Sequence, residues 1–459
     1  MEFYGREEET RKISRVLRKS GFQTLLIYGR RRVGKSELIR HCLQKESGYV
    51  LNYECKQTAE MNNVEGLSML ISEQFHFPEL KYNSIESLLK DLFVRAQKER
   101  IILVLDEYPY LKTAVKGMDS ILQSLIDQYK DSSSLKLILC GSYVETMKSL
   151  LMRENPLYGR IDLIIDLKPM DYYESALFYH DYSNEDKVRL YSVFGGIPYY
   201  SSRIDSSLSV RENIQELISS PGARLENEIP MYLKGEISKM TNTNEVFEAL
   251  ARGYHRYNDI LSQSHVSSGP TLVDTLEKLI RMELVEKQSP INDPDNRKKS
   301  GYYICDQLSL FYFRYIFRYL SQRNIMDEDT FFDRYIEEDF NSQYVPRAFE
   351  NICRQYLIRL NRKGKINPVF DRIGKYCYDG PVNRKNGEFD IVTEDPVGFI
   401  FYEAKFRRTP LSLSKIREEI EQVKSTGLNC YRYGFISSSG FDCEPDEHMI
   451  FIKLDDLFQ

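Results

Sequence analysis

A glycine-rich segment near the amino end carries residue types that together bind phosphate groups. It follows the pattern GxxxxGK[ST] and reads Gly29, Arg30, Arg31, Arg32, Val33, Gly34, Lys35 and Ser36. Glycines let successive backbone N–H groups turn toward phosphate oxygens, and a following helix adds partial positive charge at its N-terminus. Lys35 is expected to reach the β- and γ-phosphates of ATP, and the Ser36 hydroxyl is expected to bind Mg²⁺. An apolar run precedes the segment and a helical pattern follows it, which disfavours a chance glycine turn with a surface lysine.

An acidic pair, Asp106 and Glu107, follows a second apolar run and is predicted to complete this site. Asp106 is expected to hold the magnesium ion through water, and Glu107 is expected to orient and deprotonate the attacking water. Taken alone, two acids at a strand end are more commonly a solvated cap. Together with the glycine-rich segment, they favour hydrolysis of ATP over passive binding.

Two further residues are candidates for the same site, and each has an alternative. Ser142 ends a third apolar run and is predicted to sense the γ-phosphate, although it could equally be a buried serine at a strand end. Arg160 is predicted to stabilise transition-state charge on its own nucleotide or on that of a neighbouring copy. The alternative for Arg160 is a salt bridge between domains.

Elements that could position these residues are visible in the hydrophobic pattern. The continuous apolar runs over 24–28, 101–105 and 135–140 are typical of strands in a parallel sheet covered on both faces. A helix is expected over 35–44. Strands that alternate with helical stretches indicate an α/β, doubly wound P-loop core over residues 1–168.

The remainder of the chain is predicted to form four further parts. A helical lid subdomain is expected over 169–240 and a helical connector over 307–339. Between them, residues 241–306 have the pattern of three short helices and a two-stranded wing, which is a winged helix. Residues 340–459 open with a helix and continue with a hairpin, which indicates a second α/β domain.

The charge pattern of the predicted winged helix leaves its role open. Its third helix, expected over 271–283, presents a balanced set of outward residues, namely Asp274, Glu277, Lys278 and Arg281. Only the wing, Arg297 to Lys299, is clearly cationic. DNA binding and an architectural or partner-docking role are therefore both compatible with the sequence.

A second constellation of charged residues lies near the carboxyl end. Asp390 and Glu403 lie on the two predicted hairpin strands and could ligate Mg²⁺ or Mn²⁺, with Lys405 positioning the attacking water. Glu350 on the preceding helix could complete the set. Acids and lysines also alternate by chance on many solvated strands, but the apolar neighbours of Glu403 make a polar pair there costly without a purpose.

Composition narrows the class of protein. The 459 residues carry a formal net charge of −5, so a nucleic-acid contact would need a local basic patch. No apolar run reaches the length that spans a bilayer, and the charged amino end has no signal-peptide core. We therefore expect no membrane association and a cytoplasmic location. The eight scattered cysteines lack a CxxC pair, which favours reduced core thiols over a zinc site.

Several segments together resemble the archaeal-type P-loop ATPases of the STAND/AAA+-like branch. They are Tyr4 to Glu9, Asp106 to Tyr108, Pro156 to Arg160, and Gly195 to Tyr200. The resemblance implies that the segment around Arg6 packs near the adenine and that Gly195 to Tyr200 belongs to the lid. It also implies a winged helix and a C-terminal domain like the PD-(D/E)xK restriction endonucleases, which the Asp390, Glu403 and Lys405 pattern resembles.

Two functions are compatible with these observations. The first is a MgATP-binding and hydrolysing ATPase coupled to a C-terminal domain that acts on DNA or another nucleic acid. The alternative is an ATP-dependent regulatory switch whose C-terminal domain is a degenerate nuclease fold that recognises a protein partner. The oligomeric state stays open in both.

Overall fold

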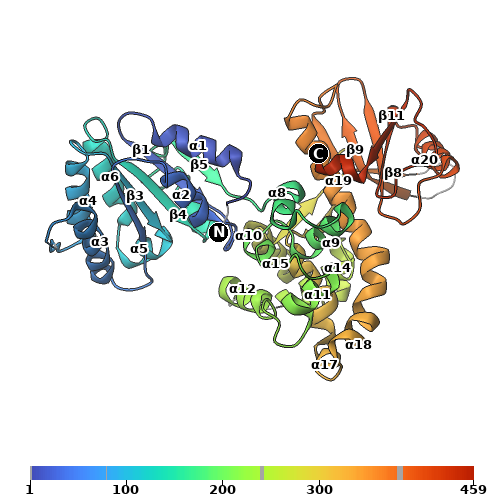
Figure 1. Cartoon of the computed structure of the whole chain (residues 1–459), viewed down its shortest axis with the longest axis horizontal. Helices are drawn as coiled ribbons and strands as arrows, with labels where there is room; N and C mark the ends of the chain where they lie inside the picture. Colours follow the sequence, from blue (N-terminus) through green and yellow to red (C-terminus); the bar gives the residue numbers. More distant parts are fainter. Residues whose placement is uncertain (1–2, 79, 238–241, 380–385) are drawn as a thin grey trace. The chain divides into compact units, whose positions relative to one another are not determined.

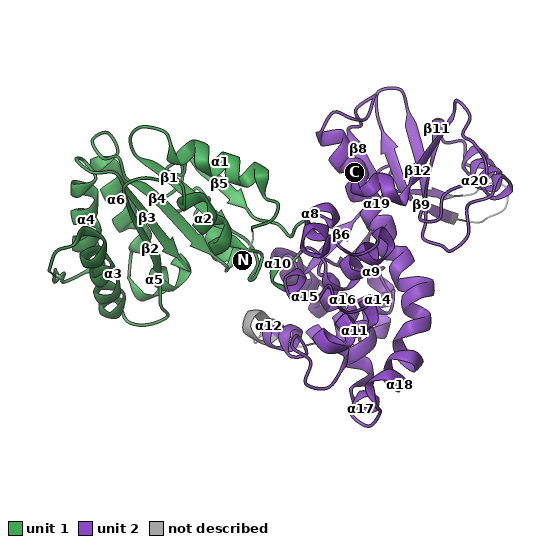
Figure 2. Cartoon of the chain, viewed as in Figure 1, with its two compact units in different colours: residues 1–170, 197–199 green, residues 171–196, 200–459 purple. Residues whose placement is uncertain are grey.

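The computed structural model describes residues 3–78, 80–237, 242–379 and 386–459. The chain divides into two compact units, coloured separately in Figure 2. Unit 1 comprises residues 1–170 together with 197–199, and unit 2 comprises residues 171–196 and 200–459. The predicted boundary between lid and winged helix, at 240–241, lies outside the described residues.

Unit 1 is built on a five-stranded parallel sheet with the strand order β2-β3-β4-β1-β5 (Figure 1). Its strands are β1 (Gln23–Tyr28), β2 (Tyr49–Glu54), β3 (Ile101–Asp106), β4 (Lys136–Gly141) and β5 (Leu163–Asp166). The three apolar runs of the sequence form β1, β3 and β4, the central strands. Their buried side chains explain why these runs show no polar alternation.

Helices cover both faces of this sheet. They are α1 (Glu7–Leu17), α2 (Lys35–Leu43), α3 (Glu60–Phe75), α4 (Ile85–Arg95), α5 (Tyr108–Ala114), α6 (Met118–Tyr129) and α7 (Val144–Ser149). Leu26, on one face of β1, belongs to a core shared with α3, α4, α5 and α6. Leu25 and Ile27 point to the other face, where they are also fully buried, and α1 packs there against α2 and β1. The predicted α/β core is therefore confirmed.

Short helices follow β5, and most of them belong to unit 2. They are α8 (Tyr172–Ala176), η1 (Leu177–Tyr179), α9 (Asn184–Phe194), α10 (Pro198–Ser201), α11 (Val210–Ile214), η2 (Gln215–Ser219) and α12 (Glu228–Ile237). The helical pattern of this region was predicted, but one stretch belongs elsewhere. Residues 197–199 group with unit 1, so the segment from Gly195 to Tyr200 does not belong entirely to a separate lid.

Three helices and a two-stranded antiparallel sheet follow in the predicted order. They are α13 (Thr243–Ala251), α14 (Tyr257–Gln263), α15 (Gly269–Arg281), β6 (Val285–Gln288) and β7 (Gly301–Ile304). Helix α15 begins two residues before the predicted start because the Ser268 hydroxyl accepts the Thr271 N–H, 3.4 Å away, and Pro270 fits the first turn. The cationic residues Arg297 to Lys299 lie between β6 and β7.

A series of helical segments then leads to the last domain. They are α16 (Gln307–Phe311), η3 (Tyr312–Ile316), η4 (Phe317–Tyr319), α17 (Leu320–Arg323), α18 (Glu328–Phe332), η5 (Asp333–Glu337), η6 (Phe340–Tyr344) and α19 (Val345–Arg362). The π-type turns η3, η5 and η6 were not distinguishable in the sequence from ordinary helix. Aromatic side chains such as Phe311, Phe313 and Tyr315 are buried along this stretch.

The carboxyl-terminal part of unit 2 is a five-stranded mixed sheet with the order β12-β11-β10-β9-β8 (Figure 1). Its elements are β8 (Arg372–Asp379), β9 (Asn386–Glu394), β10 (Phe399–Lys405), α20 (Leu413–Ser425), β11 (Cys430–Ser437), β12 (Met449–Lys453) and η7 (Leu454–Phe458). Strands β8, β9 and β10 are antiparallel, whereas β10, β11 and β12 are parallel. The predicted hairpin corresponds to β9 and β10.

Two properties of the described residues bear on the sequence-based expectations. No described helix is both long and apolar enough to cross a bilayer. All eight cysteines are free thiols, and five of them are buried.

Candidate ATP site and the carboxyl-terminal charged cluster

The glycine-rich segment forms the turn that connects β1 to α2, as the sequence predicts. At Gly29 there is no room for a side chain, because a Cβ atom would lie 2.3 Å from the backbone oxygen of Leu167. Gly34 precedes α2 with φ of 95°, a left-handed conformation that glycine adopts without strain. These two positions allow the backbone to turn sharply and place the N-terminus of α2 beside the loop.

Lys35 lies inside the loop that it is predicted to serve. Its ammonium group donates hydrogen bonds to the backbone oxygens of Gly29 at 2.9 Å and Arg30 at 3.0 Å. Burial lowers the pKa of Lys35, and the nearby acids Glu107 and Asp106 act in the opposite direction. A lysine that spans the loop in this way is positioned to exchange carbonyl oxygens for the stronger, charge-assisted acceptors of a phosphate.

Ser36 and Asp106 meet although 70 residues separate them in sequence. The Ser36 hydroxyl donates to Asp106 Oδ2 at 2.6 Å. A hydroxyl and a carboxylate are hard oxygen donors, which is the ligand chemistry that Mg²⁺ prefers in proteins. Their closeness means that both oxygens reach one point at the edge of the loop, so the donor set fits a magnesium ion held there directly or through water.

Glu107 is held by an interaction that the sequence did not predict. Its carboxylate Oε2 accepts the Ser142 hydroxyl at 3.0 Å and the Ser142 N–H at 3.2 Å. Its own N–H donates to Asp106 Oδ1 at 2.9 Å, and its φ of 50° is uncommon for a residue with a side chain. Strand β4 lies between β1 and β3, which explains why Ser142 falls beside Glu107. In this state Ser142 orients the acid, and its role as a γ-phosphate sensor stays a prediction.

The arginines of the loop have separate partners within unit 1. The Arg31 guanidinium donates to the Tyr143 hydroxyl at 3.2 Å, and the Arg32 guanidinium lies 4.1 Å from the centre of the Tyr199 ring. Arg30 is buried, as is Val33. Tyr143 was not singled out from the sequence, and Tyr199 was named only as part of the segment from Gly195 to Tyr200, because no short motif marks residues that act only by stacking or hydrogen bonding to the loop.

The early segment implied by the family resemblance also contacts the loop. Arg6 has a left-handed backbone with φ of 60° and is buried. Its guanidinium donates to the backbone oxygens of Val33 at 3.3 Å and Lys168 at 2.6 Å. Arg6 therefore fastens the loop to the segment that follows β5.

Arg160 is placed away from the phosphate loop, which does not support a role on the nucleotide of its own chain. Its guanidinium forms two hydrogen bonds with Asp127 of α6, at 2.7 and 2.9 Å. Arg160 precedes β5, whereas the phosphate loop follows β1, and these two strands are parallel neighbours. The two sites therefore lie at opposite ends of the parallel strands, about 15–20 Å apart for strands of this length. Its salt bridge is within unit 1 rather than between domains, and action on a neighbouring copy stays a prediction.

Acidic residues of the carboxyl-terminal set are near one another. Helix α19, which carries Glu350, packs against β8, β9 and β10. Strands β9 and β10 pair in a register that ends with Ile391 opposite Tyr402, and one further step puts Asp390 opposite Glu403. Burial, followed by the charge of Asp390, raises the pKa of Glu350 to about 8. Burial also raises the pKa of Glu403, against the opposing effect of Lys405.

Two of the predicted metal ligands, Asp390 and Glu403, are paired with lysines in this structure. Among the described residues, no three His, Cys, Asp or Glu side chains are arranged to hold a metal ion. Instead, Lys405 forms an ion pair with Glu403, and Lys375 contacts Asp390 at 3.1 Å and Glu388 at 3.0 Å. Two ammonium groups therefore neutralise the carboxylates for which a cation was predicted.

Lys375 is the functional candidate that the sequence reasoning missed. It lies on β8, where Gly374 and a shift of register interrupt the alternation that marks a strand. Burial opposes its charge, but Tyr303 and the acids Asp390 and Glu388 raise its pKa above the ordinary value for lysine. It is therefore charged in the folded protein.

His255, near this cluster, gives a pH-dependent prediction. Burial lowers its pKa to about 4, helped by Lys375 and Arg347 and opposed by Glu388 and by the bond of its Nδ1 to the Tyr302 carbonyl oxygen. Because the unfolded chain binds this proton near pH 6.5, the stability that the neutral His255 contributes is lost as pH falls from 6.5 to 4. The loss amounts to about 3 kcal/mol.

The comparison with His255→Asn isolates this effect, because Asn can still donate to the Tyr302 carbonyl. The free energy of unfolding should be measured in urea at pH 7.5 and at pH 4. Between these two pH values, wild type should lose more stability than the variant. An unchanged difference would show that His255 does not titrate with folding.

Two known protein families match separate parts of the chain. Residues 3–203 match a family described as an ATPase domain predominantly from Archaea. Residues 312–420 match a family described as archaeal and bacterial proteins of unknown function. The amino-terminal part is therefore similar to archaeal ATPase domains, whereas the second match assigns no activity to the carboxyl-terminal part.

Individual proteins are also similar to this chain. An uncharacterized protein of Methanocaldococcus jannaschii is 27% identical over 99% of this chain and 100% of its own length. An uncharacterized ATP-binding protein of the same archaeon is 22% identical over 52% of this chain and 76% of its own. A Walker-type ATPase of Pyrococcus abyssi has a similar structure, with a TM-score of 0.51 and 21% identity, covering 68% of this chain and 96% of that one. That likeness concerns the fold.

Proposed function

We propose that unit 1 binds and hydrolyses MgATP at the loop between β1 and α2. The observation that carries this proposal is the convergence of Lys35, Ser36, Asp106 and Glu107, which come from two separate strand ends. The match of residues 3–203 to an archaeal-type ATPase domain supports it. The oxygens of Ser36 and Asp106 would hold Mg²⁺, which when bound withdraws charge from the phosphate oxygens.

Each residue then has one role in the reaction. The backbone N–H groups at the start of α2 and the Lys35 ammonium bind the β- and γ-phosphates and stabilise the charge that spreads over them. The Glu107 carboxylate accepts the proton of the attacking water, which is oriented in line with the leaving oxygen. Because the carboxylate oxygen of Glu107 is bonded to Ser142 here, it must leave Ser142 or share that bond when water binds.

For the carboxyl-terminal domain, the proposal is an action on nucleic acid that depends on a divalent metal. It is supported by the closeness of Glu350, Asp390 and Glu403, because the charge of Asp390 adds to burial in raising the pKa of Glu350 and of Glu403, and a divalent cation would relieve this repulsion. Mg²⁺ or Mn²⁺ would have to replace the ammonium group of Lys375 beside Asp390 and that of Lys405 beside Glu403. Lys405 would then be free to position a water beside the phosphodiester.

This proposal predicts metal-dependent cleavage that requires Asp390. Purified wild type should cleave single-stranded or duplex DNA in Mg²⁺ or Mn²⁺, and Asp390→Ala should be at least about 100-fold slower, since a metal ligand stabilises several kcal/mol of charge. Asp371→Ala, an exposed acid just before β8, is the matched control and should cleave like wild type. Equal rates for wild type and Asp390→Ala would remove the nuclease claim.

A second candidate is a regulatory ATPase whose carboxyl-terminal domain only recognises a partner. The ion pairs of Lys375 with Asp390 and of Lys405 with Glu403 favour it, because they satisfy the carboxylates without a metal. It predicts ATP turnover that disappears in Lys35→Ala, with neither binding nor cleavage of DNA at low salt. Binding of Mn²⁺ at Asp390 in the absence of nucleotide would exclude it.

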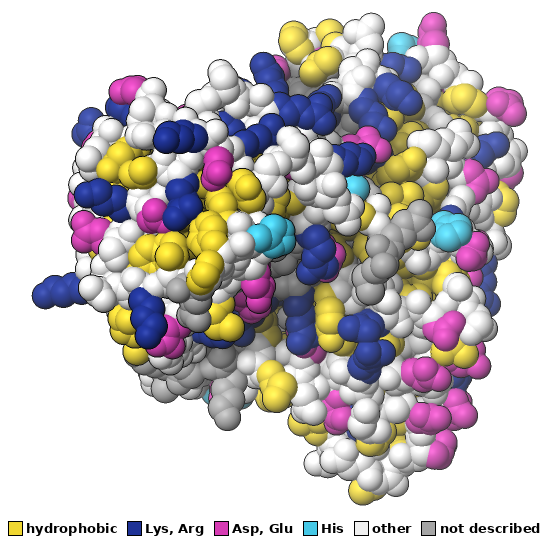
Figure 3. All heavy atoms as spheres, turned by 60° about the vertical axis from the view of Figure 1, so that its left-hand side comes forward, with side chains coloured by type: hydrophobic (Ala, Val, Ile, Leu, Met, Phe, Trp, Pro, Cys, Tyr) yellow, Lys and Arg dark blue, Asp and Glu magenta, His cyan; other side chains and the backbone are white. Residues whose placement is uncertain are grey.

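Bulk charge does not decide between the two candidates. Both acidic and basic side chains are present on the face of the molecule that Figure 3 displays. A nucleic acid would therefore have to be recognised at a local site with its own arrangement of cations.

A further inference from the structure

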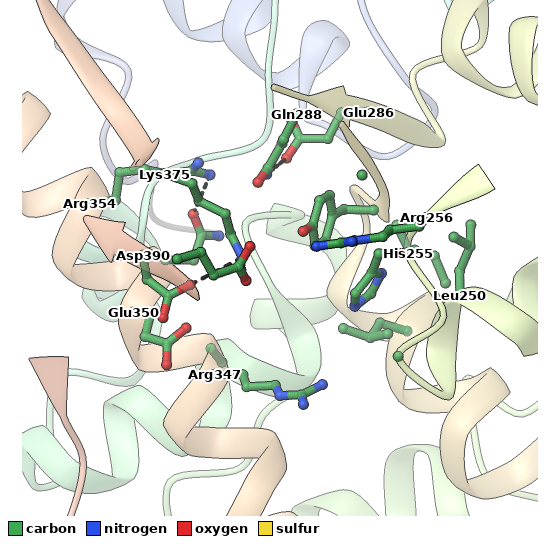
Figure 4. Close-up of a pocket in the computed structure, with 18 of the residues that line it drawn as sticks. Leu250, His255, Arg256, Glu286, Gln288, Arg347, Glu350, Arg354, Lys375 and Asp390 are labelled. Atoms are coloured by element: carbon green, nitrogen blue, oxygen red, sulfur yellow. Dashed lines mark hydrogen bonds and ion pairs between the residues drawn. The ribbon is translucent and has the colours of Figure 1, made fainter. Parts of the chain in front are cut away.

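Unit 2 contains a cavity of about 750 Å³. Its walls come from the turn between α13 and α14, from β6 and β7, from α19, and from β8 and β9 (Figure 4). Asp390 and Glu350 line it, whereas Glu403 and Lys405 do not. The cavity therefore opens on one side of the carboxyl-terminal charged cluster.

Helix α19 presents a polar stripe to this cavity. Arg347, Glu350, Asn351 and Arg354 all line it, and their spacing of three, four and seven residues places them on one face of the helix. The opposite face packs into the protein through fully or nearly buried residues, including Phe349, Ile352 and Cys353. The side of α19 that bears two arginines is thus the side left for a ligand.

Arginines approach the cavity from two walls. Arg256 extends from the turn between α13 and α14, opposite Arg347 and Arg354 on α19 (Figure 4). Within the part of the chain that the structure describes, neither Arg256 nor Arg347 forms a hydrogen bond or an ion pair, and both are exposed. Arg354 donates one hydrogen bond, to Asn351 Oδ1 at 3.0 Å. Guanidinium groups with unused donors are well matched to phosphate oxygens.

Five acids line the cavity beside these arginines, namely Asp259, Glu286, Glu350, Glu388 and Asp390, and burial raises the pKa of Glu350 to about 8. Glu388 and Asp390 are both paired with Lys375, whose contacts are drawn in Figure 4, and Glu286 accepts a hydrogen bond from Gln288. Another basic residue of the lining, Arg314, is by contrast committed to Asp339 at 2.7 and 2.8 Å. On the two facing walls, the guanidinium groups of Arg256 and Arg347, and part of that of Arg354, keep donors available for a ligand.

We infer that this cavity binds the phosphodiester backbone of a single nucleic-acid strand, held between Arg256 and the α19 pair Arg347 and Arg354. Its volume is in the range of sites that enclose one small organic ligand, which suits a few linked nucleotides but not a double helix. The inference rests on the proposed action on nucleic acid and places the strand next to Asp390.

Recognition at this site concerns phosphates rather than bases. The Tyr303 ring, which lines the cavity, is stacked on His255 with ring centres 4.3 Å apart, and the Lys375 ammonium lies 5.5 Å from the ring centre. The partners of this ring are already supplied by the protein, so it does not serve as a stacking platform of the kind used by sequence-tolerant single-strand binders. Binding is therefore carried by charge and depends strongly on salt.

Fluorescence anisotropy with a labelled 12-nucleotide strand, measured on the full chain in EDTA, tests this inference without any cleavage. The double variant Arg256→Gln/Arg347→Gln should bind at least 10-fold more weakly than wild type. The slope of log Kd against log salt should also fall by about 0.7 for each phosphate that the variant no longer neutralises. The charge-matched control Arg372→Gln/Arg408→Gln removes two exposed arginines outside the cavity and should stay within about twofold, as expected for surface charges.

Competing ligands distinguish the sources of phosphate. An unlabelled strand should displace the labelled strand at a concentration well below the concentration at which AMP or duplex displaces it. Displacement by AMP as effective as by the strand would overturn the assignment in favour of a free nucleotide, and equal Kd values for wild type and the cavity variant would overturn the site itself. Strand binding that depends on Arg256 and Arg347 without cleavage in Mn²⁺ would support this inference while refuting the proposed nuclease.

Both arginines are exposed, so their replacement is expected to leave the fold intact. Single variants provide a second check, because Arg256→Gln and Arg347→Gln should each weaken binding about threefold or more. A variant that no longer binds but unfolds at the same temperature as wild type would support the site. Two single variants that both bind as tightly as wild type would contradict it.

Discussion

Glu107→Gln is expected to bind MgATP with an affinity close to that of wild type while turning it over about 100- to 10,000-fold more slowly, the range by which a positioned general base accelerates a reaction. The amide keeps the shape of the side chain and can still bond to the Ser142 hydroxyl, but it cannot accept a proton from water. The residues that bind the phosphates, Lys35 and Ser36, are unchanged. Binding and turnover are thereby separated at one residue.

The measurements are titration calorimetry with MgATP at 4 °C and release of inorganic phosphate at saturating ATP. Glu86→Gln removes an exposed acid of α4 in the same unit and serves as the control, with kcat within twofold of wild type. A Glu107→Gln protein that hydrolyses ATP at the wild-type rate would show that another group deprotonates the water.

Arg323→Ala is expected to destabilise unit 2 by about 3–5 kcal/mol, which is the usual effect of breaking one side of a buried ion pair. Arg323 is only 1% exposed. Its guanidinium bonds to Glu226 at 2.8 Å and to the backbone oxygens of Ser219 and Ser220. Removing it leaves a partly buried carboxylate and two carbonyl groups at the end of η2 without these donors.

Chemical unfolding followed by circular dichroism measures this loss. Arg318→Ala, an exposed arginine of the same helical stretch, should lose less than about 1 kcal/mol. Arg323→Lys should fall between the two, because it keeps the charge but not the fork of donors. If Arg323→Ala unfolds at the denaturant concentration of Arg318→Ala, the buried cluster is not what holds η2 to α17.

The phosphate loop could be predicted from the sequence because its functional residues are consecutive in the chain. Gly29 to Ser36 combine a turn, a helix start and two functional side chains, and Asp106 is found by counting to the end of the next buried run. The hydrogen bonds between Ser142 and Glu107 could not be predicted. They depend on β4 lying between β1 and β3 and on the rotamers of two side chains.

Residues whose partners lie on other elements were harder to predict. Arg160 has the chemistry of a catalytic arginine, but its position opposite Asp127 follows from how the chain runs along α6. Lys375 was overlooked because Gly374 breaks the strand pattern of β8. Alternation along the hairpin strands indicates that Asp390 and Glu403 can share a face. The spacing of residues does not indicate which lysines form ion pairs with these two acids.

The cavity of unit 2 could not be anticipated at all from sequence. Arg256 and Arg347 are 91 residues apart, and neither belongs to a motif. On α19 the amphipathic pattern indicates which face is buried. It does not indicate that the other face lies against β6, β7 and the turn after α13, which is what makes Arg347 and Arg354 the wall of a cavity.

Release of inorganic phosphate from ATP by the wild-type chain and by Lys35→Ala, prepared in the same way and measured with and without Mg²⁺, is the decisive measurement for the proposed ATP site. We expect turnover by wild type that requires Mg²⁺ and falls at least about 100-fold in Lys35→Ala, because the buried ammonium is the cation that meets the transferred phosphoryl group. Magnesium-dependent turnover that is equal in the two proteins would contradict the proposal, since hydrolysis would then occur at a site other than this loop.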